Sequence, residues 1–522
     1  MQENYMAIPK EKFEFAQIDR EMHDEKLKTK ARGYFQDAMI RFKKNKSSVV
    51  AAFIILLLVI FAIVSPIISP YTVYDKNDEY QKYPPFVEGV ASLGIGILDG
   101  TTTIDGNETR ILKLYAIGVE TGKDVVIGEP ELYEYELIYK GRPTKRTSYH
   151  ITVNRYYEKG IIMKTMSVEE YYDIQRWQNE TGIQVLYPMV TSDTVYAGVE
   201  AKDVPAWDPF TNSNVWYQCD KSTAPVLDAN GNYIPAYTTN AAIAGSTQPY
   251  NSLRVEGDNG SYVYCEEKSG SVQCRIEYYN YYQYKNDGLK PTFLFGTDTY
   301  GRDLFCAIGM GARFSLIFAI LVSAINLTIG AIYGAIQGYY GGAIDLTMDR
   351  ISDILSGVPF MVVATLFQLH LAQKVGIVPS FLFAFVLTGW IGMAALTRKQ
   401  FYRFKNQEYV MAARTLGASD KRIMFKHILP NSLGTMVTSC ALVIPGVISS
   451  ETNLTYLKIV DLSKFVGTSI GELMSLGQEG MSSAPHAMFF PALFISLLLI
   501  SFNLFGNGLR DAFNPSTRGV DD

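Results

Sequence analysis

The sequence contains few cysteines and few histidines. There are five of each among 522 residues, with no C-x-x-C pair, which excludes a disulfide-dense scaffold and argues against a structural zinc site. A large charge excess of one sign is also absent, because 47 Lys and Arg face 52 Asp and Glu. The resulting net charge of −5 argues against a nucleic-acid partner, since such partners require a basic surface.

Charge and hydrophobicity are segregated along the chain. Residues 71–292, called the module below, hold 20 basic and 30 acidic residues and 26 of the 35 tyrosines. The remaining sequence holds 27 basic and 22 acidic residues, so it carries a small positive excess. This pattern predicts a polar folded domain inserted into a membrane protein.

Six apolar segments are candidates to cross a membrane, since about 20 apolar residues in a helix span the hydrocarbon core. They are Val49–Ile68, Phe314–Tyr333, Ile354–Ala372, Ile377–Leu396, Leu433–Ser450 and Ala487–Phe505. The third is interrupted by glycine, proline and polar residues, so a re-entrant segment is the alternative there. A secretory signal peptide is a poor interpretation of the first, because 48 mostly polar residues precede it.

The distribution of basic residues predicts the orientation. Arg41, Lys43, Lys44 and Lys46 flank the first span, and residues 397–431 carry eight Lys and Arg. With six spans, the N-terminus, this loop and the C-terminus fall on one side, which the positive-inside rule makes cytoplasmic. The module then lies outside the cell. The acidic residues Asp345, Asp349 and Asp353 sit in another predicted cytoplasmic loop and run against this charge pattern.

The loop 397–431 contains a predicted pair of short helices. A helical run from Glu408 to Leu416 ends at Gly417. Glycine commonly ends a helix because it readily adopts the left-handed backbone conformation needed there. Ser419 or Asp420 then caps a second helix, which is expected to end at or near Pro430. On composition alone, an ordinary basic interfacial loop is the favoured interpretation, and a partner-contacting projection is the alternative.

This loop resembles the EAA loop of ABC importer permeases, through Ala412, Ala413, Gly417, Leu429 and Pro430. The match is closer to the C-type permease subunit of bacterial dipeptide and oligopeptide importers. Three further stretches, in residues 296–316, 338–359 and 502–515, are similar to blocks of that family in the same order. The family's EAA glutamate is replaced here by Met411, its isoleucine position holds His427, and the module stands where the family has a short external loop.

The resemblance implies a fold and a set of partners. The expected fold is a mainly α-helical polytopic membrane protein of the type I ABC importer permease fold, with six transmembrane helices and an inserted β-rich α+β extracytoplasmic domain. It implies a cytoplasmic segment 1–48 with an interfacial elbow helix at 34–46, a first transmembrane helix at 49–70, the module at 71–292, a permease core at 293–516 and a cytoplasmic tail at 517–522.

The resemblance also implies a role for the loop. In such importers the EAA loop docks into a cytoplasmic ATPase, whose closure drives alternating access. The residues carried over as coupling residues are Glu408, Ala412, Ala413, Gly417, Ala418, Leu429 and Pro430. The chain has no G-x-x-x-x-G-K-[ST] sequence, so ATP and magnesium are expected on separate ATPase subunits and not on this non-catalytic chain. No metal site is expected.

The implied partners are a second homologous permease subunit, two cytoplasmic ATPases, a substrate-binding lipoprotein, a peptide substrate and the lipid bilayer of the bacterial plasma membrane. Nickel or another small solute is the alternative cargo. Two other classes of function stay open. A membrane receptor would use the scaffold to signal, and an anchored extracytoplasmic enzyme would carry its activity in the module.

The predicted membrane segments contain glycines suited to close helix packing and several polar residues. Gly330, Gly334 and Gly338 form two successive G-x-x-x-G steps that predict close helix packing, either within this chain or with a second subunit. Polar groups inside a membrane are functional candidates by default. Those present are Asn326, Gln337, Gln368, His370 and Glu451.

The module contains Tyr-rich alternating runs at residues 132–141, 148–157 and 275–284, which predict strands. Asp105–Gly106 and Asn230–Gly231 predict tight turns, and Ser167 with Glu170 predicts a capped helix over 167–179. Cys265 and Cys274 flank a predicted hairpin turn and are candidates for a disulfide. The module can dock a lipoprotein, bind peptide directly or act as a lid or spacer.

Overall fold

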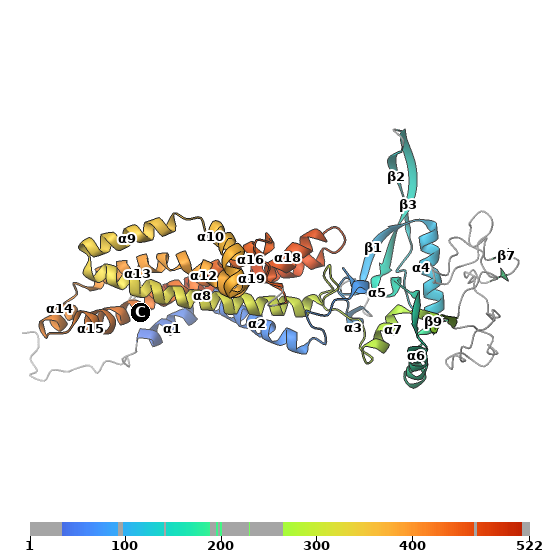
Figure 1. The fold of residues 1–522 in the computed structure, drawn as a ribbon, viewed down its shortest axis with the longest axis horizontal. Coiled ribbons are helices and arrows are strands. Elements are labelled where there is room, and N and C mark those ends of the chain that lie inside the picture. The colour runs from blue at the N-terminus through green and yellow to red at the C-terminus, as the bar shows by residue number, and fades with distance from the viewer. Residues whose placement is uncertain are drawn as a thin grey trace, which may run out of the picture.

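The computed structural model describes residues 34–91, 98–139, 142–187, 195–196, 199–200, 229, 265–463 and 467–513. Figure 1 shows an elongated molecule, with a bundle of long helices at one end and the module at the other. The chain passes between the two parts where α2 (Lys46–Ile68) ends and where α8 (Leu304–Tyr340) begins. The two parts therefore share only two chain crossings.

Five of the six predicted spans are confirmed as helices long and apolar enough to cross a membrane. Within the described residues these are Lys46–Ile68, Leu304–Tyr340, Ile377–Phe404, Asp420–Tyr456 and His486–Phe513. The sixth is a pair of helical segments, Gly342–Ser356 and Phe360–Val375, bent by 72° at a short break.

The break in the third predicted span follows from its sequence. Helix α9 (Gly342–Ser356) ends before Gly357, and α10 (Phe360–Leu366) starts after Pro359. Proline disfavours helical geometry in the residue before it, so a continuous helix through Val358 is strained. A π-helical turn over Phe367–Leu371 follows and contains Gln368 and His370, which are the polar residues noted in the sequence.

The other segments of the bundle are helical as well. Helix α1 occupies most of the segment expected to form the elbow helix, with Ala38 and Phe42 buried, and its interfacial position stays a prediction. The rings of Phe42 and Phe505 lie 5.5 Å apart, so α1 packs on the last helix. The remaining helices are α1 (Tyr34–Lys44), α11 (Ala372–Val375), α12 (Ile377–Gly389), α13 (Ile391–Phe404), α14 (Glu408–Thr415), α15 (Asp420–Arg422), α16 (Leu429–Tyr456), α18 (Ile470–Glu479) and α19 (His486–Phe513).

The core of the bundle forms around α8. Its small buried residues, such as Ala312 and Ala319, let neighbouring helices approach closely, and the surrounding cluster includes Ile448 of α16 and Leu498 of α19. Asp303 caps the helix, because its carboxylate accepts hydrogen bonds from the backbone N–H groups of Phe305 and Cys306.

The described part of the module is α+β, with small antiparallel sheets. One sheet has the strand order β1-β3-β2, a second has the order β4-β9-β5 with β8 also paired to β9, and β6 pairs with β7. The strands are β1 (Thr101–Gly106), β2 (Glu131–Tyr139), β3 (Arg142–Asn154), β4 (Ile161–Ser167), β5 (Leu186–Tyr187), β6 (Val195–Tyr196), β7 (Val199–Glu200), β8 (Cys265–Lys268) and β9 (Ser271–Glu277). The helical segments are η3 (Asp78–Tyr80), α3 (Glu88–Ala91), α4 (Glu108–Thr121), α5 (Arg155–Glu158), α6 (Val168–Thr181) and α7 (Tyr278–Lys285).

The sequence predictions for the module have mixed outcomes. The first Tyr-rich strand is confirmed as β2, and the second is confirmed as β3 up to Asn154, after which residues 155–157 belong to α5. The capped helix is confirmed as α6, with Ser167 accepting a hydrogen bond from the N–H of Glu170. The third run is wrong in its second half, because residues 278–285 form a helix. In that helix, Tyr279 and Tyr281 are buried in two different apolar clusters, so tertiary packing outweighs β propensity.

The predicted turn at Asp105–Gly106 is wrong as well. These residues end strand β1, and the following Asn107 caps helix α4 with its side chain. The second predicted turn, Asn230–Gly231, lies outside the described residues.

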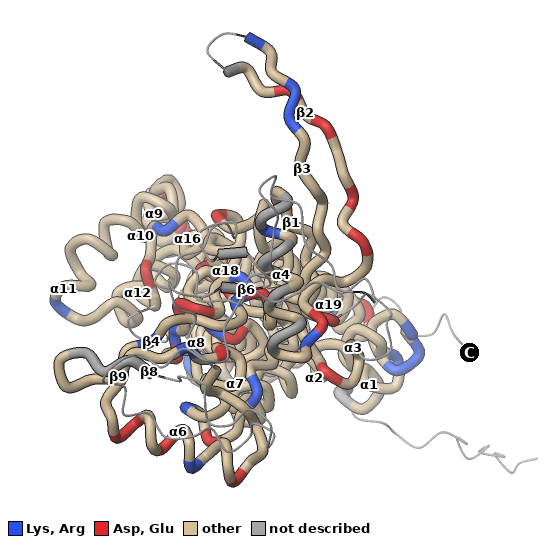
Figure 2. Tube along the Cα trace, turned by 90° about the vertical axis from the view of Figure 1, so that its right-hand side faces the viewer, with Lys and Arg blue, Asp and Glu red and all other residues tan. Residues whose placement is uncertain are grey.

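The β2–β3 hairpin projects sideways from the module as a two-stranded arm (Figures 1 and 2). Strand β2 pairs with β3 from Glu131 opposite His150 to Tyr139 opposite Arg142, whereas β1 reaches only as far as Tyr149. Ile138 is 81% exposed. An isolated two-stranded ribbon is only marginally stable in water. The arm therefore depends for its stability on the sheet at its base.

Residues 293–303 fix the module to the bundle. The Thr297 hydroxyl accepts a hydrogen bond from the N–H of Tyr83 and donates one to Tyr80, and the N–H of Lys82 donates to the carbonyl of Asp298. On the bundle side, Arg302 is buried, pairs with Asp298 at 2.7 Å and donates to the carbonyl of Gly467. This segment therefore contacts the module and the loops between the last helices at once.

Candidate functional site

The loop segment 405–430 lies at the end of the bundle farthest from the module (Figure 1). Helix α14 ends in a Schellman arrangement, in which the N–H of Ala418 donates to the carbonyl of Ala413 and the N–H of Gly417 donates to that of Arg414. Gly417 has φ of +80°, the left-handed conformation that glycine adopts without strain. Ser419 caps α15 through the N–H of Arg422. The predicted bend at Gly417 is confirmed.

The predicted end of the second helix at Pro430 is wrong. The chain continues from α15 through a π-helical turn, Ile423–Ile428, into α16, so Pro430 lies in the first turn of the long helix. Proline lacks an N–H and clashes with the carbonyl of the preceding turn. The wider π turn directly before Pro430 accommodates the ring without ending the helix.

One apolar cluster anchors the loop segment to the bundle. Val410 of α14 and Ile423 are fully buried against Ala335 and Tyr339 of α8 and Phe401 of α13. A polar contact adds to this packing, because the Tyr339 hydroxyl donates to Asp420 at 2.5 Å. The orientation of the loop segment is therefore coupled to the end of α8.

The outer surface of the loop segment is exposed and apolar at its tip. Leu416 is 88% exposed and Met411 is 51% exposed. Glu408 and Ala412 are also exposed, and Ala413 and Ala418 are half-buried. Small residues beside a protruding leucine form a knob that a partner can approach closely. Protruding apolar side chains of this kind mark a protein contact surface.

A shallow hollow of about 460 Å³ lies beside this knob. Lys421, Arg422 and Lys426 line it together with Phe425 and Pro430. Its basic rim and apolar floor suit an acidic protein surface better than another basic one. Leu429 is half-buried next to it, and its side chain joins the anchoring cluster.

The departures from the family pattern lie in this region. Met411, at the position of the family's glutamate, points into the exposed tip, and His427 is half-buried in the π turn. The side chain of Arg414, three residues after Met411, donates to the Tyr339 hydroxyl at 3.4 Å. A polar link between α14 and the bundle is thus present although the glutamate is not.

A partly buried ion-pair network lies between α9 and α13. The Arg398 guanidinium pairs with Asp345 at 2.6 Å and with Asp349 at 2.9 Å, and the Tyr402 hydroxyl donates to Asp345. The acidic excess that runs against the basic-loop pattern is therefore largely paired with one arginine. The sequence showed these charges but gave no signal that they meet, because 49 residues or more separate the partners.

The three glycines of α8 face α13 of the same chain. A side-chain carbon at Gly330 would lie 2.7 Å from Met393 Cβ, one at Gly334 would lie 2.2 Å from the carbonyl oxygen of Ala394, and one at Gly338 would lie 2.5 Å from Phe401 Cβ. Each distance is far below van der Waals contact. Backbone approach of α8 and α13 therefore requires glycine at all three positions.

Glu451 is fully buried in α16. One of its carboxylate oxygens accepts a hydrogen bond of 2.7 Å from the Ser315 hydroxyl of α8, and the other is buried with no hydrogen-bond partner in the described part of the chain. Asn326 and Gln337 are buried in α8, whereas Gln368 and His370 lie on the more exposed π turn. The five polar residues do not come together as one site.

The two candidate disulfide cysteines lie opposite one another in the β8–β9 register. Cys274 is buried, and its Sγ lies 3.7 Å from the carbonyl oxygen of Lys164. The disulfide stays a prediction. Among the described residues, no group of three or more His, Cys, Asp or Glu side chains is arranged to hold a metal ion.

Comparison with known families gives two matches. A family described as "Binding-protein-dependent transport system inner membrane component" matches residues 326–519. A second, described as "N-terminal TM domain of oligopeptide transport permease C", matches residues 33–85. The helical bundle thus carries both similarities, and the sheets of the module lie between them.

Individual relatives agree with these matches. The chain is 39% identical over 224 residues to the oligopeptide transport system permease protein OppC of Bacillus subtilis, covering 43% of this chain and 72% of that protein. It is 37% identical over 228 residues to the dipeptide transport system permease protein DppC of the same organism, covering 43% and 69%. Escherichia coli OppC is 34% identical over 224 residues, covering 43% and 72%.

Among solved structures, the chain is similar to one from inward-facing conformations of the MetNI methionine ABC transporter. The TM-score is 0.33 at 14% sequence identity, covering 40% of this chain and 96% of that one.

Proposed function

Because this chain belongs to the family of oligopeptide and dipeptide ABC transport permeases, we propose that it forms half of the translocation path of an ATP-driven peptide importer. Its relatives are named for oligopeptide and dipeptide transport, so peptides are the proposed cargo. A second homologous permease completes the path, and two ATPase subunits bind and hydrolyse ATP with magnesium. A substrate-binding lipoprotein delivers the peptide.

The observation that carries this proposal is the geometry of the loop segment. It presents an exposed knob at Leu416, with Ala412 and Ala413 beside it, on a base fixed to α8 through Val410 and Tyr339. A surface that is fixed to α8 and has small side chains beside its protruding leucine suits transmission of an ATPase's closure into the bundle. The chain itself holds no phosphate-binding loop, so hydrolysis belongs to another subunit.

The proposed orientation places the loop segment in the cytoplasm of a bacterial cell. The N-terminal helix α1 and the end of α19 lie toward the same end of the bundle as the loop segment (Figure 1). Arg41, Lys43 and Lys44 of α1 and the eight Lys and Arg of residues 397–431 belong to this end. The module then projects outside the plasma membrane, above the translocation path. We assign it no catalytic activity and propose that it acts in receiving the delivered peptide.

The test uses substitutions in the loop segment. Ala413→Arg places a long charged side chain on the contact face, and Gly417→Pro removes the N–H of the Schellman arrangement and forbids a φ of +80°. Both variants are expected to insert normally and to lose peptide uptake. Gln36→Arg, which adds the same charge at an exposed position of α1, is the matched control and is expected to transport normally.

Two results would count against the proposal. Normal uptake by both loop variants would remove the coupling role of the segment. Purification of the intact chain from native membranes without any ATPase subunit, under detergent conditions that preserve related complexes, would favour a receptor instead.

A further inference from the structure

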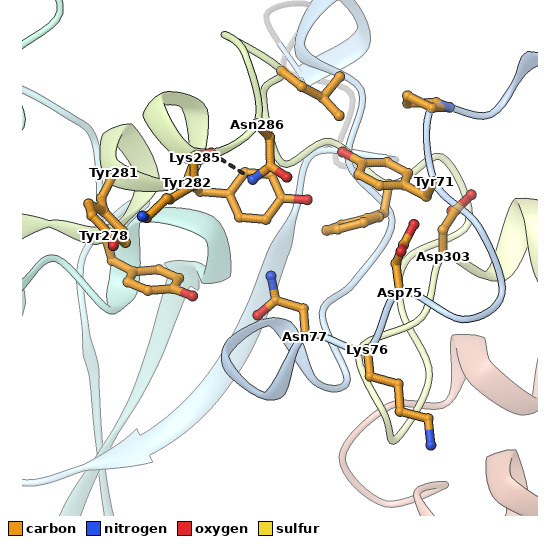
Figure 3. A pocket seen from close by; sticks show the side chains of 14 residues that line it. Tyr71, Asp75, Lys76, Asn77, Tyr278, Tyr281, Tyr282, Lys285, Asn286 and Asp303 are labelled. Atoms are coloured by element: carbon orange, nitrogen blue, oxygen red, sulfur yellow. Dashed lines mark hydrogen bonds between the residues drawn. The ribbon is translucent and has the colours of Figure 1, made fainter. Parts of the chain in front are cut away.

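A cavity of about 400 Å³ lies where the module meets the bundle (Figure 3). It is open on one side and lined by helix α7 of the module, by the segment 70–77 that follows α2 and by Gly301 and Asp303, which precede α8. Ligand pockets in proteins commonly have about 300–1,000 Å³. The cavity therefore has room for a small organic molecule and is larger than a bare metal ion requires.

Aromatic rings form much of its wall. Tyr71 and Phe293 lie with ring centroids 4.7 Å apart, and Tyr278, Tyr281 and Tyr282 contribute from α7. The face of an aromatic ring attracts a cation, and tyrosine is among the rings that do so well. A wall of this kind favours organic cations over anions.

Two carboxylates line the same cavity. Asp303 is 4% exposed, and its oxygens accept hydrogen bonds from the Ser69 hydroxyl and from two backbone N–H groups. Asp75 is exposed, and one of its oxygens accepts from the N–H of Thr72 at 2.7 Å. In the part of the chain that the structure describes, neither carboxylate has a basic side chain within ion-pair distance.

The negative charges of both carboxylates act on the phenol of Tyr282. Burial raises the pKa of the Tyr282 phenol to about 12, against the lowering effect of a hydrogen bond with Tyr71, and the negative charges of Asp75 and Asp303 add to the rise. Figure 3 shows the Tyr282 side chain of α7 across the cavity from Asp75 and Asp303.

The lysines that line the cavity do not neutralise this charge. Lys285 pairs with Glu170 at 2.7 Å, away from the carboxylates, and Lys76 lies with its Nζ 5.1 Å from the ring centroid of Tyr300. The cavity therefore combines uncompensated negative charge with an aromatic wall.

From this combination we infer that the cavity is a binding subsite for a primary ammonium group, namely the amino terminus of a short peptide held between the module and the membrane bundle. This inference rests on the proposed function for the identity of the ligand. A metal ion fits less well, because most of the wall offers rings instead of oxygen ligands. The subsite lies at the start of α8, so a peptide bound there is held at the outer end of the bundle.

The test measures peptide binding to the purified importer complex without its lipoprotein. Isothermal titration compares the dipeptide Ala-Phe with N-acetyl-Ala-Phe, which lacks the ammonium group. We expect Ala-Phe to bind at least about tenfold more tightly, since a hydrogen bond to a charged group is involved. Asp75→Asn is expected to remove most of this difference.

A matched control uses the same segment of chain. Asp78→Asn removes one negative charge from an exposed residue that does not line the cavity, and it is expected to bind Ala-Phe as the unmodified complex does. Asp303→Ser is a second variant that keeps a helix-capping side chain while removing the charge, and it is expected to weaken Ala-Phe binding.

The outcomes separate this inference from the proposed function. Equal affinities for the two peptides, or equal weakening by Asp75→Asn and Asp78→Asn, would overturn the subsite even if uptake is normal. If Ala-Phe binding depends on the ammonium group and Asp75→Asn abolishes that dependence, the subsite is supported even if the complex transports no peptide. A complex that transports no peptide would overturn the proposed importer function.

Discussion

The hydroxyl of Tyr339, in the last turn of α8, donates a 2.5 Å hydrogen bond to Asp420 at the start of α15. Arg414 of α14 donates to the same hydroxyl, so one phenol connects both short helices of the loop segment to the longest helix of the bundle. This contact gives a force on the loop segment a direct route into α8. The Val410 packing next to it makes the connection stiff.

Removing this hydroxyl tests the connection. Tyr339→Phe keeps the ring in the anchoring cluster. It is expected to weaken the packing of the loop segment on α8 by about 1.5–3 kcal/mol, because a hydrogen bond to a charged group is lost. We expect normal insertion and ATPase recruitment but less peptide transported per ATP hydrolysed. Tyr340→Phe, at the neighbouring half-exposed residue, is the matched control. An unchanged transport-to-hydrolysis ratio in Tyr339→Phe would contradict the connection.

A second prediction concerns the ion pair between Lys123 and Glu277 in the module. Glu277 is 2% exposed, and the Lys123 ammonium also lies 4.4 Å from the ring centroid of Tyr279. Burial lowers the pKa of Lys123 and raises that of Glu277, so each charge depends on the other. Lys123→Met is expected to destabilise the module by about 3–5 kcal/mol, because it leaves a buried carboxylate unpaired.

Pairing the substitution with Glu277→Gln provides the control for this prediction. The double variant removes both charges and is expected to recover much of the lost stability, measured as the midpoint of thermal unfolding of the full chain in detergent. If Lys123→Met and the double variant unfold at the same temperature, the loss comes from the lysine's packing and not from the unpaired charge.

Much of the bundle could be predicted from the sequence because its signals are local. Long apolar runs identify five spans directly, and Gly417 identifies the bend of the loop segment through its backbone conformation alone. The error at Pro430 has a local cause too. Proline normally ends a helix, and the π turn that avoids its clash has no recognisable sequence pattern.

The parts that escaped prediction depend on contacts between distant residues. Tyr339 looks like any interfacial tyrosine until the fold brings Asp420 to it from 81 positions away. The tyrosines of α7 show the alternation of a strand, yet they form a helix because two separate clusters bury them from both sides. The cavity beside α7 combines Tyr71 and Asp75 with Asp303, whose distance from them along the chain hides its proximity.

The projecting hairpin arm leads to a third prediction. Replacing residues 133–148 with Asn-Gly joins Leu132 to Tyr149, which lie directly opposite each other in the register, through a favoured two-residue turn. The arm beyond Tyr149 pairs with no third strand in the described module. We therefore expect the shortened chain to keep its unfolding midpoint within about 2–4 °C, a change of 1 kcal/mol or less. A larger drop would show that the arm contributes to the fold.

A fourth prediction concerns Cys265 and Cys274. Their Cα atoms are register partners on adjacent antiparallel strands, and an extracellular location would permit oxidation. We expect the protein purified from native membranes to gain the mass of two alkylating groups at these cysteines only after reduction. Cys306, buried at the start of α8, serves as a reference thiol whose labelling does not depend on reduction. Labelling of both register partners without reduction would refute the disulfide.

The last prediction is the pH dependence of ammonium binding in the cavity. Burial, and after it the nearby charge of Asp298, raises the pKa of Asp303 above its usual value of 3.8. The carboxylate is charged above its folded-state pKa and neutral below it, so it attracts a cation only on the alkaline side. Affinity for Ala-Phe is therefore expected to fall as the pH drops, beginning at a higher pH than an ordinary aspartate would give. In Asp303→Ser this early loss should disappear. A titration series of the two proteins from neutral to acid pH measures the difference, and parallel curves would show that Asp303 does not contribute its charge to binding.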